Sequence, residues 1–443
     1  MNIQLSEHFT YKKLLRFILP SIIMMVFTSI YSVVDGIFVS NFVGKSAFAS
    51  VNLIMPYLMG ISALGFMIGT GGSAFVSKTL GEGKKELANQ YFSMLVTIAA
   101  IGGFVLSVLS FIFMRRIVMA FGAAGDLIDY CTLYGRISCI SLTAFMLQNV
   151  FQSFFVAAGK PQLGLKVIVA AGCTNIVLDA LFIDVLHFGI AGAAFATMTS
   201  EFIGGLLPMV YFFRKNDSLL HFVKPVFDRR VFLKTCTNGS SELMTNLSMS
   251  LVNALYNLQL MKIAGENGVA AYGAVMYVNF IFVATFLGYA IGCAPVISYH
   301  YGAGNHAELK NLYKKSMSII LVWGVILFGA AQLLAPVLSK IFVGYNTGLY
   351  AMTLHGFRVY AIAFLIIGIN IFGSSFFTAL NNGLISAVIS FLRTLMFQVI
   401  MVLTLPLWFG INGIWSAIGV AEALTLIMTT IFFVRQKDKY HYL

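Results

Sequence analysis

The chain has 443 residues, of which 59% are apolar and only 10% are charged, whereas about a quarter of the residues in an ordinary soluble domain are charged. This composition excludes a water-soluble fold and predicts an integral membrane protein. A net charge of +12 would suit a nucleic-acid-binding protein, but the basic residues lie in the polar breaks between apolar runs. We therefore interpret the charge as a topology signal and expect no nucleic-acid partner.

Apolar runs long enough to cross a bilayer, which takes about 20 residues, fill nearly the whole chain. In the first half they cover residues 15–42, 48–75, 92–113, 127–158, 163–182 and 190–213. In the second half they cover residues 239–263, 269–298, 317–337, 349–380, 384–408 and 411–434. The sequence predicts an all-α membrane protein with twelve transmembrane helices.

The second half of the chain repeats the first after 221 residues. Eight glycines recur at this spacing, where chance predicts about two; the pairs are Gly44/Gly265, Gly71/Gly292, Gly81/Gly302, Gly83/Gly304, Gly103/Gly324, Gly135/Gly356, Gly189/Gly410 and Gly192/Gly413. Because each half has an even number of spans, both halves enter the membrane from the same side and form parallel repeats, an arrangement typical of transporters. We predict two six-helix lobes, residues 1–213 and 239–443, joined by a linker at 214–238.

The basic residues predict the orientation. With both termini on one side of the membrane, that side receives 21 of the 28 Lys and Arg residues. By the positive-inside rule the termini and the linker are cytoplasmic, and the chain lies in the plasma membrane. Five cysteines without C-x-x-C spacing argue against a disulfide framework or a zinc site, so we expect no cofactor, and a monomer is the simplest assembly.

Acids inside the spans need an explanation, because a carboxylate at mid-bilayer costs roughly 2.5 to 3.5 kcal/mol on insertion scales. Asp35 in the first span and Asp179 in the fifth are both predicted to face the interior of the N-terminal lobe. Asn175 lies one helical turn before Asp179, on the same face. Two carboxylates in one apolar pocket cannot both stay ionised cheaply unless a cation lies between them, so this pattern predicts a proton or sodium site.

Four other residues of the spans receive secondary roles. Glu201 and Glu422 are repeat mates near the middle of the sixth and twelfth spans, where lobe packing and gating are equally plausible; Arg393 is deep enough to pair with Glu422. Pro20 removes a backbone donor from the first span, and the resulting bend either changes how Asp35 faces the lobe or only helps packing. Outside this group, Glu242 is expected to cap the start of the seventh span.

At these residues the chain resembles the multidrug and toxic compound extrusion family over nearly its full length. The stretch Val34-Asp35-Gly36-Ile37-Phe38-Val39, with Pro20 before it, is similar to the first span of the family. Asn175-Ile176-Val177-Leu178-Asp179, followed by Phe188-Gly189-Ile190-Ala191-Gly192, is similar to the family's signature across spans five and six. The resemblance is strongest to the DinF-like and MepA-like branch, because span ten has no acid, whereas NorM-like members carry acids in spans seven and ten.

The resemblance implies a site for a coupling proton or sodium ion in the N-terminal lobe. The residues that match the family's site are Asp35, Tyr134, Asn175, Asp179 and Thr197, with Gln152 as a further polar residue of that lobe. Na⁺, if it is the coupling ion, would be held by Asp35, Asn175, Asp179 and Thr197.

The resemblance also implies antiport, in which a cation enters down its gradient while an organic compound leaves. The 41 Phe, 19 Tyr and 21 Met residues offer stacking, cation–π and adaptable thioether contacts to amphipathic or cationic drugs. Met146, Tyr277 and Phe280 are candidates for such contacts.

Two other functions stay open. A flippase for lipid-linked sugars of the same superfamily would need several cations in its central cavity, and only Arg393 is clearly deep. An intramembrane enzyme would use paired acids as base or metal ligands, but no D-D-x-x-D, H-E-x-x-H or G-x-S-x-G pattern is present. We therefore expect a transporter that is not an enzyme.

Overall fold

The computed structural model describes residues 3–43, 45–344 and 346–443, and all of the secondary structure in these ranges is helical. Gly44, one of the repeated glycines, lies outside the described residues. The described residues form eleven helical units that are long and apolar enough to cross a membrane. The helices are α1 (Tyr11–Phe38), α2 (Lys45–Gly81), α3 (Lys85–Ala120), α4 (Leu127–Ala157), α5 (Pro161–Asp179), α6 (Gly189–Phe213), α7 (Arg229–Gly302), α8 (His306–Val343), α9 (Thr347–Tyr360), α10 (Phe364–Ala379), α11 (Gly383–Phe391), α12 (Phe397–Phe409) and α13 (Ile411–Tyr440).

Twelve predicted spans become eleven long helical units because α7 runs through spans seven and eight. Its backbone departs from helical geometry at Gly265, where φ is 62°, a conformation that glycine adopts without a steric penalty. Spans ten and eleven are each built from two helices joined by a short turn of different pitch, Ala361–Ala363 and Leu392–Met396. The prediction of an all-helical fold is confirmed.

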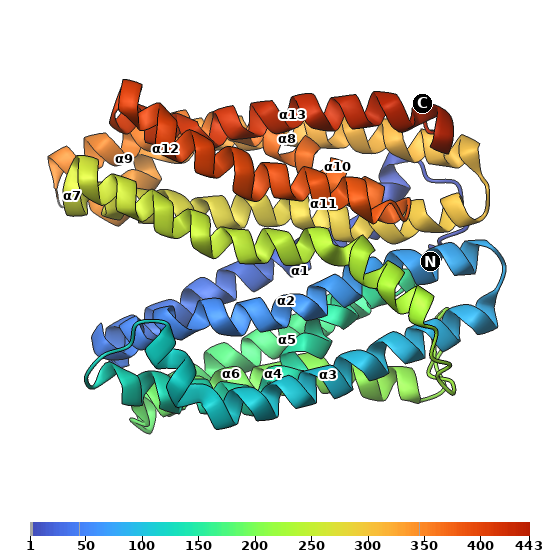
Figure 1. Cartoon of the computed structure of the whole chain (residues 1–443), viewed down its shortest axis with the longest axis horizontal. Coiled ribbons are helices and arrows are strands. Elements are labelled where there is room, and N and C mark those ends of the chain that lie inside the picture. Colours follow the sequence, from blue (N-terminus) through green and yellow to red (C-terminus); the bar gives the residue numbers. More distant parts are fainter. Residues whose placement is uncertain (1–2, 44, 345) are drawn as a thin grey trace.

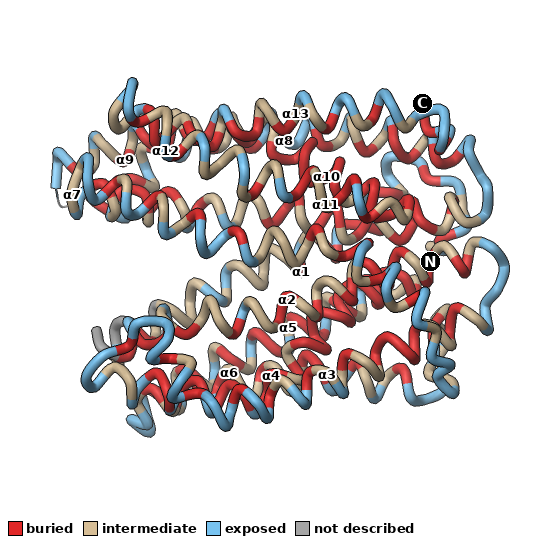
Figure 2. The backbone as a smooth tube through the Cα atoms, viewed as in Figure 1, coloured by how far each residue is buried: buried red, intermediate tan, exposed pale blue. Residues whose placement is uncertain are grey.

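The helices form two bundles (Figure 1). α1 to α6 make one bundle, the N-lobe, and α7 to α13 make the other, the C-lobe. The bundles meet near the end that carries both termini and diverge toward the opposite end. Figure 2 shows buried residues inside each bundle and where the bundles meet.

A buried helix lies at the centre of each lobe. In α4, 83% of the most apolar window is buried, and in the α9–α10 unit the value is 72%, against 22–56% for the other spans. The two central units are repeat mates. Most side chains in the buried part of α4 are therefore shielded from lipid.

The repeat also includes an aromatic cluster in each lobe. Phe92 of α3 contacts Phe154 and Phe212 with ring centroids 5.0 Å apart, and its mate Tyr313 contacts Phe376 at 5.3 Å and Phe433 at 5.2 Å. One more ring packs on each cluster. Phe222 of the linker contacts Phe92, and Tyr442 of the C-terminus contacts Tyr313, each with ring centroids 5.1 Å apart. The first part of the linker thus takes the place in the N-lobe that the C-terminal tail takes in the C-lobe.

Two repeated glycines let the lobes approach closely. A Cβ atom on Gly81 would overlap the carbonyl oxygen of Tyr299, and one on Gly302 would overlap that of Lys78. The end of α2 and the end of α7 therefore cross at backbone contact, at the end of the molecule where the bundles meet.

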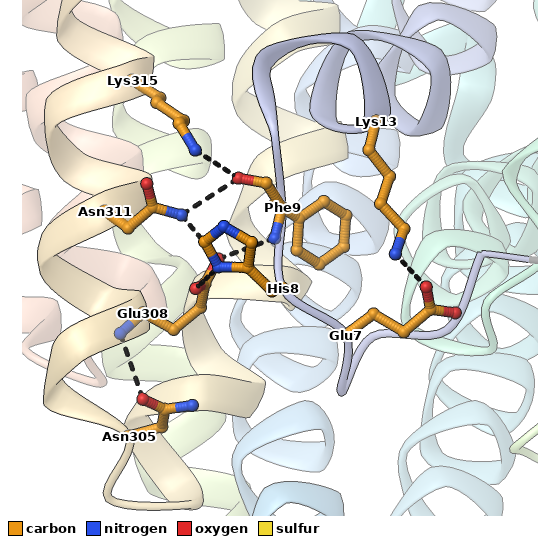
Figure 3. A network of polar contacts seen from close by, with 8 residues as sticks. All are labelled: Glu7, His8, Phe9, Lys13, Asn305, Glu308, Asn311 and Lys315. Carbon is orange, nitrogen blue, oxygen red and sulfur yellow. Dashed lines mark hydrogen bonds and ion pairs between the residues drawn. The ribbon is translucent and has the colours of Figure 1, made fainter.

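Residues 3–10, which we call the N-terminal strap, tie the start of α1 to the C-lobe (Figure 3). The backbone N–H of Phe9 donates to Glu308 Oε1 at 2.9 Å, and its carbonyl accepts from Asn311 at 3.0 Å and from Lys315 at 2.6 Å. His8 Nδ1 lies 2.6 Å from Glu308 Oε2. The ring of Phe9 is fully buried, so the strap is packed as well as hydrogen-bonded.

One helix boundary near the linker and the role of Glu242 differ from the sequence-based expectation. α7 begins at Arg229, ten residues earlier than predicted, because Asp228 accepts hydrogen bonds from the N–H groups of Arg230 and Val231 and caps the helix. The expectation that Glu242 caps this helix is wrong, since it lies more than three turns inside it.

Candidate functional site

A cavity of about 100 Å³ lies inside the N-lobe and contains most of the predicted ion site. Asp35 reaches it from α1, Tyr134 from α4, Asn175 from α5, and Thr197 and Glu201 from α6. Five predicted residues from four helices thus share one cavity. The remaining predicted residue of the ion site, Asp179, is fully buried beside it.

The carboxyl groups of Asp35 and Asp179 lie next to each other. One oxygen of Asp35, both oxygens of Asp179, the amide oxygen of Asn175 and the hydroxyl of Thr197 are buried without a hydrogen-bond partner among the described residues. Carboxylate, amide and hydroxyl oxygens are the ligands that hard cations prefer, and a carboxylate can equally bind a proton. Buried polar atoms that lack partners are rare in folded proteins and point to a function.

No basic residue whose side chain the structure describes compensates these acids. Among the residues that the structure describes, no lysine, arginine or histidine lines the cavity, and none forms an ion pair with Asp35, Asp179 or Glu201. Glu201 instead accepts a hydrogen bond from the hydroxyl of Ser141 at 2.5 Å. The cavity is therefore a concentration of acids that only an incoming cation or proton can neutralise.

Local helix geometry positions these side chains. A π-helical turn, Ala180–Val185, follows Asp179 directly, and another, Val39–Val43, follows Asp35 by one turn. Such turns insert a residue into the helical repeat and are frequent at functional sites. Pro20 is buried within α1, which runs as a continuous helix from Tyr11 to Phe38.

The buried acid of the C-lobe, Glu422, is paired with a basic residue. Glu422 is fully buried, and its Oε1 accepts a hydrogen bond from Arg393 at 2.8 Å. Asn370 donates to Oε2 at 2.7 Å and in turn accepts from Thr429 at 3.0 Å. The ion pair that the sequence indicated is present, and it leaves Glu422 neutralised within the protein.

Two adjoining cavities lie between the lobes and inside the C-lobe. One, of about 120 Å³, is lined by Met25 of α1, Thr70 of α2 and Glu242 of α7. The other, of about 170 Å³, also contains Met25 and extends to Phe280 and to the Arg393–Glu422 pair. Residues of both lobes thus line a region with thioether, aromatic and acidic groups.

The remaining predicted substrate contacts do not share one cavity. Phe280 lines the larger C-lobe cavity, but Tyr277 stacks on Phe342 with centroids 5.7 Å apart. Met146 is buried against Gly65 and Gly103 in the N-lobe. Gln152 is also buried, and it lines none of the cavities described above.

Sequence reasoning missed several lining residues, namely Tyr31, Ser138, Thr245, Met249, Asn253, Tyr256 and Asn279. Glu242 was noticed but was interpreted as a helix cap. It followed the predicted start of an apolar run by three residues, and recognising Asp228 as the cap would have placed it inside the helix instead of at its start. A neutral polar residue such as Asn253 within an apolar run is not marked by the sequence pattern as one that lines a cavity.

Comparisons with known proteins agree with this architecture. The model of the MatE family matches the chain twice, at residues 20–181 and 243–404. A multidrug export protein, MepA of Staphylococcus haemolyticus, is 24% identical over 434 residues, covering 97% of this chain and 93% of the relative.

Two solved structures share the fold. A MATE transporter in complex with MaL6 superimposes with a TM-score of 0.93 at 23% identity, covering 99% of this chain and 98% of the other. An outward-facing multidrug resistance MATE family transporter of the MOP superfamily gives 0.92 at 24% identity, with the same coverage.

Proposed function

Because the chain belongs to the MatE family of transporters, we propose that it exports amphipathic or cationic organic compounds in exchange for H⁺ or Na⁺. The observation that carries this proposal is the pair of adjacent acids, Asp35 and Asp179, whose oxygens lack partners and which have no basic neighbour in the described part of the chain. The export of many drugs is supported by the name of the staphylococcal relatives, multidrug export proteins.

In the proposed cycle Asp179 takes up the coupling ion from outside, and Asp35 sets the affinity of the site. Uptake weakens the hold on the substrate or bends α1 near Pro20, and the drug is released outward. A proton that crosses 100 mV and one pH unit gains about 3.7 kcal/mol, which supports a gradient of roughly 500-fold for a neutral substrate.

We further propose that the termini and the linker are cytoplasmic, as the distribution of Lys and Arg predicts. The bundles meet at that end and diverge at the other (Figure 1), so in this orientation the structure corresponds to an outward-facing state. The region between the lobes then receives substrate and opens outward.

The test is transport by protein reconstituted in liposomes, with ethidium as the probe and either a pH gradient or a Na⁺ gradient as the only driving force. We expect Asp179→Asn and Asp35→Asn to abolish gradient-driven ethidium movement. The matched control is Asp184→Asn, an exposed acid in the π-helical turn that follows Asp179, which should transport normally. Coupled transport by the Asp179→Asn variant at the normal rate would contradict the proposal.

The flippase receives no support from the central region. Among the described residues that line the two central cavities, Arg393 is the only cation, and it is already paired with Glu422. A pyrophosphate group would meet an acid, Glu242, in the smaller of the two.

A further inference from the structure

A fourth cavity, unrelated to the acidic site, lies at the end of the N-lobe that holds the chain terminus and the linker. Its volume is about 290 Å³, and it lies between the start of α1, the α4–α5 turn, the end of α6 and the linker. We call it the basic cavity. Nothing in the transport mechanism uses it.

Three cations line the basic cavity: Arg16 of α1, Lys160 of the α4–α5 turn and Lys166 of α5. The turn is made by Gly159, whose φ of 73° suits glycine best and brings Lys160 over the start of α5. Asp217 is the only acid among the described residues of the lining, so these residues carry an excess of positive charge.

The pairing of these charges is incomplete. Lys160 Nζ lies 2.7 Å from Asp217 Oδ2, and this contact holds the pKa of the Asp217 carboxyl below its usual value. In the described part of the chain, Arg16 and Lys166 have no acidic partner within ion-pair distance. Two unpaired cations therefore face one cavity from two different helices.

The rest of the lining is amphipathic. Tyr211 and Gln162 add a hydroxyl and an amide, whereas Ile3, Phe17 and Leu163 add apolar surface. A guanidinium with several donors beside an ammonium is a typical receptor for a phosphate group. Apolar walls next to these cations would suit a ligand whose charged group continues into an acyl chain.

We propose that the basic cavity binds a phosphate group, and that its source is the headgroup of an anionic phospholipid. The location favours this source, because the basic cavity lies where apolar helices end and the predicted cytoplasmic face begins. Basic pockets between transmembrane helices on that side are known to take anionic headgroups. The ligand would bridge α1 and α5, the two helices that supply Asp35 and Asp179.

The test uses the full-length protein in a neutral detergent and measures binding of fluorescent phosphatidylglycerol by anisotropy. The variant is Arg16→Gln with Lys166→Gln, and the control is Lys224→Gln with Arg229→Gln, which removes the same charge from exposed positions outside the cavity. We expect the first variant to bind roughly twenty-five-fold more weakly, since each of the two cations near a membrane surface contributes about five-fold. The control should bind like the unaltered protein.

Two competition measurements identify the source of the phosphate. Phosphatidylcholine should not displace the probe, and inorganic phosphate should displace it only at concentrations far above those of the lipid. The lipid source would be wrong under one pattern of results. Inorganic phosphate would stabilise the unaltered protein against heat but not the cavity variant, while the lipid would bind the unaltered protein and the cavity variant equally. The site would then bind a soluble phosphate.

The proposal would be overturned altogether if the cavity variant and the control variant bound fluorescent phosphatidylglycerol equally and also bound inorganic phosphate equally. Should the cavity variant unfold, Arg16→Lys with Lys166→Arg keeps both charges and must retain binding, while Arg16→Gln and Lys166→Gln separately must each weaken it.

Discussion

The two lobes share a fold but differ in how they hold buried charge. Glu201 and Glu422 are repeat mates, yet Glu201 accepts a hydrogen bond from a serine, whereas Glu422 is bound by Arg393. The position 221 residues before Arg393 is Gly172, which has no side chain. The N-lobe therefore keeps acids that can receive an ion, and the C-lobe has a permanent internal counter-ion.

Other repeat mates show the same division. Asp35 corresponds to Tyr256 and Asp179 to Ile400, so the C-lobe carries no acid at either position. An internal repeat can thus preserve the packing of its glycines and aromatic rings while the chemistry of one copy changes. Packing constrains both copies equally, but only one copy needs a titratable site.

Breaking the Arg393–Glu422 pair of the C-lobe should have the largest effect on the stability of the protein. Arg393→Gln leaves the Glu422 carboxylate buried without its counter-ion, and we expect a loss of about 3–5 kcal/mol in the free energy of unfolding. Thermal unfolding in detergent measures this loss. The double variant Arg393→Gln with Glu422→Gln should recover most of it, and a double variant as unstable as the single one would show that the pair does not act as an ion pair.

The aromatic clusters allow a second comparison between the lobes. Tyr442 is fully buried and donates a hydrogen bond to the carbonyl of Phe433 at 2.8 Å, whereas its counterpart Phe222 is only half-buried. Tyr442→Ala should destabilise the protein by about 3 kcal/mol, and Phe222→Ala by less. Comparing the two midpoints of thermal unfolding checks the order, and a larger loss for Phe222→Ala would contradict it.

The smallest change in stability is expected in the N-lobe. Glu201→Gln removes an ionisable group that has no ionic partner among the described residues, and it keeps an oxygen that can accept the Ser141 hydrogen bond, so stability should change by less than about 1 kcal/mol. The same unfolding assay applies, with Arg393→Gln as the reference. A loss as large as that of Arg393→Gln would mean that Glu201 is paired, and the contrast between the lobes would fail.

The sequence predicted most of this architecture because burial in lipid leaves a strong pattern. Apolar runs gave the spans, and the repeated glycines gave the relation between the halves, since positions such as Gly81 and Gly302 permit only glycine at a backbone crossing. Asp35 and Asp179 were recognisable because a charge in a membrane is costly. How these residues act in transport stays a prediction.

Other features could not be read from the chain. Whether Glu242 lies inside a helix depended on a cap at Asp228, within a linker whose polar composition suggested no helix. Tyr256 and Asn253 line a cavity, but a polar neutral residue in an apolar run has a small energetic cost and leaves no distinctive pattern. The arrangement of Met146 and Tyr277 away from the cavities depends on helix rotation, which hydropathy does not specify.

The N-terminal strap also has a consequence for the order of assembly. His8 and Phe9 are made about three hundred residues before their partner Glu308, so they leave the ribosome long before α8 exists. The strap can bind its partners only after α8 has been made. Its attachment therefore closes the molecule late in biogenesis, and a chain interrupted before α8 would leave Phe9 uncovered.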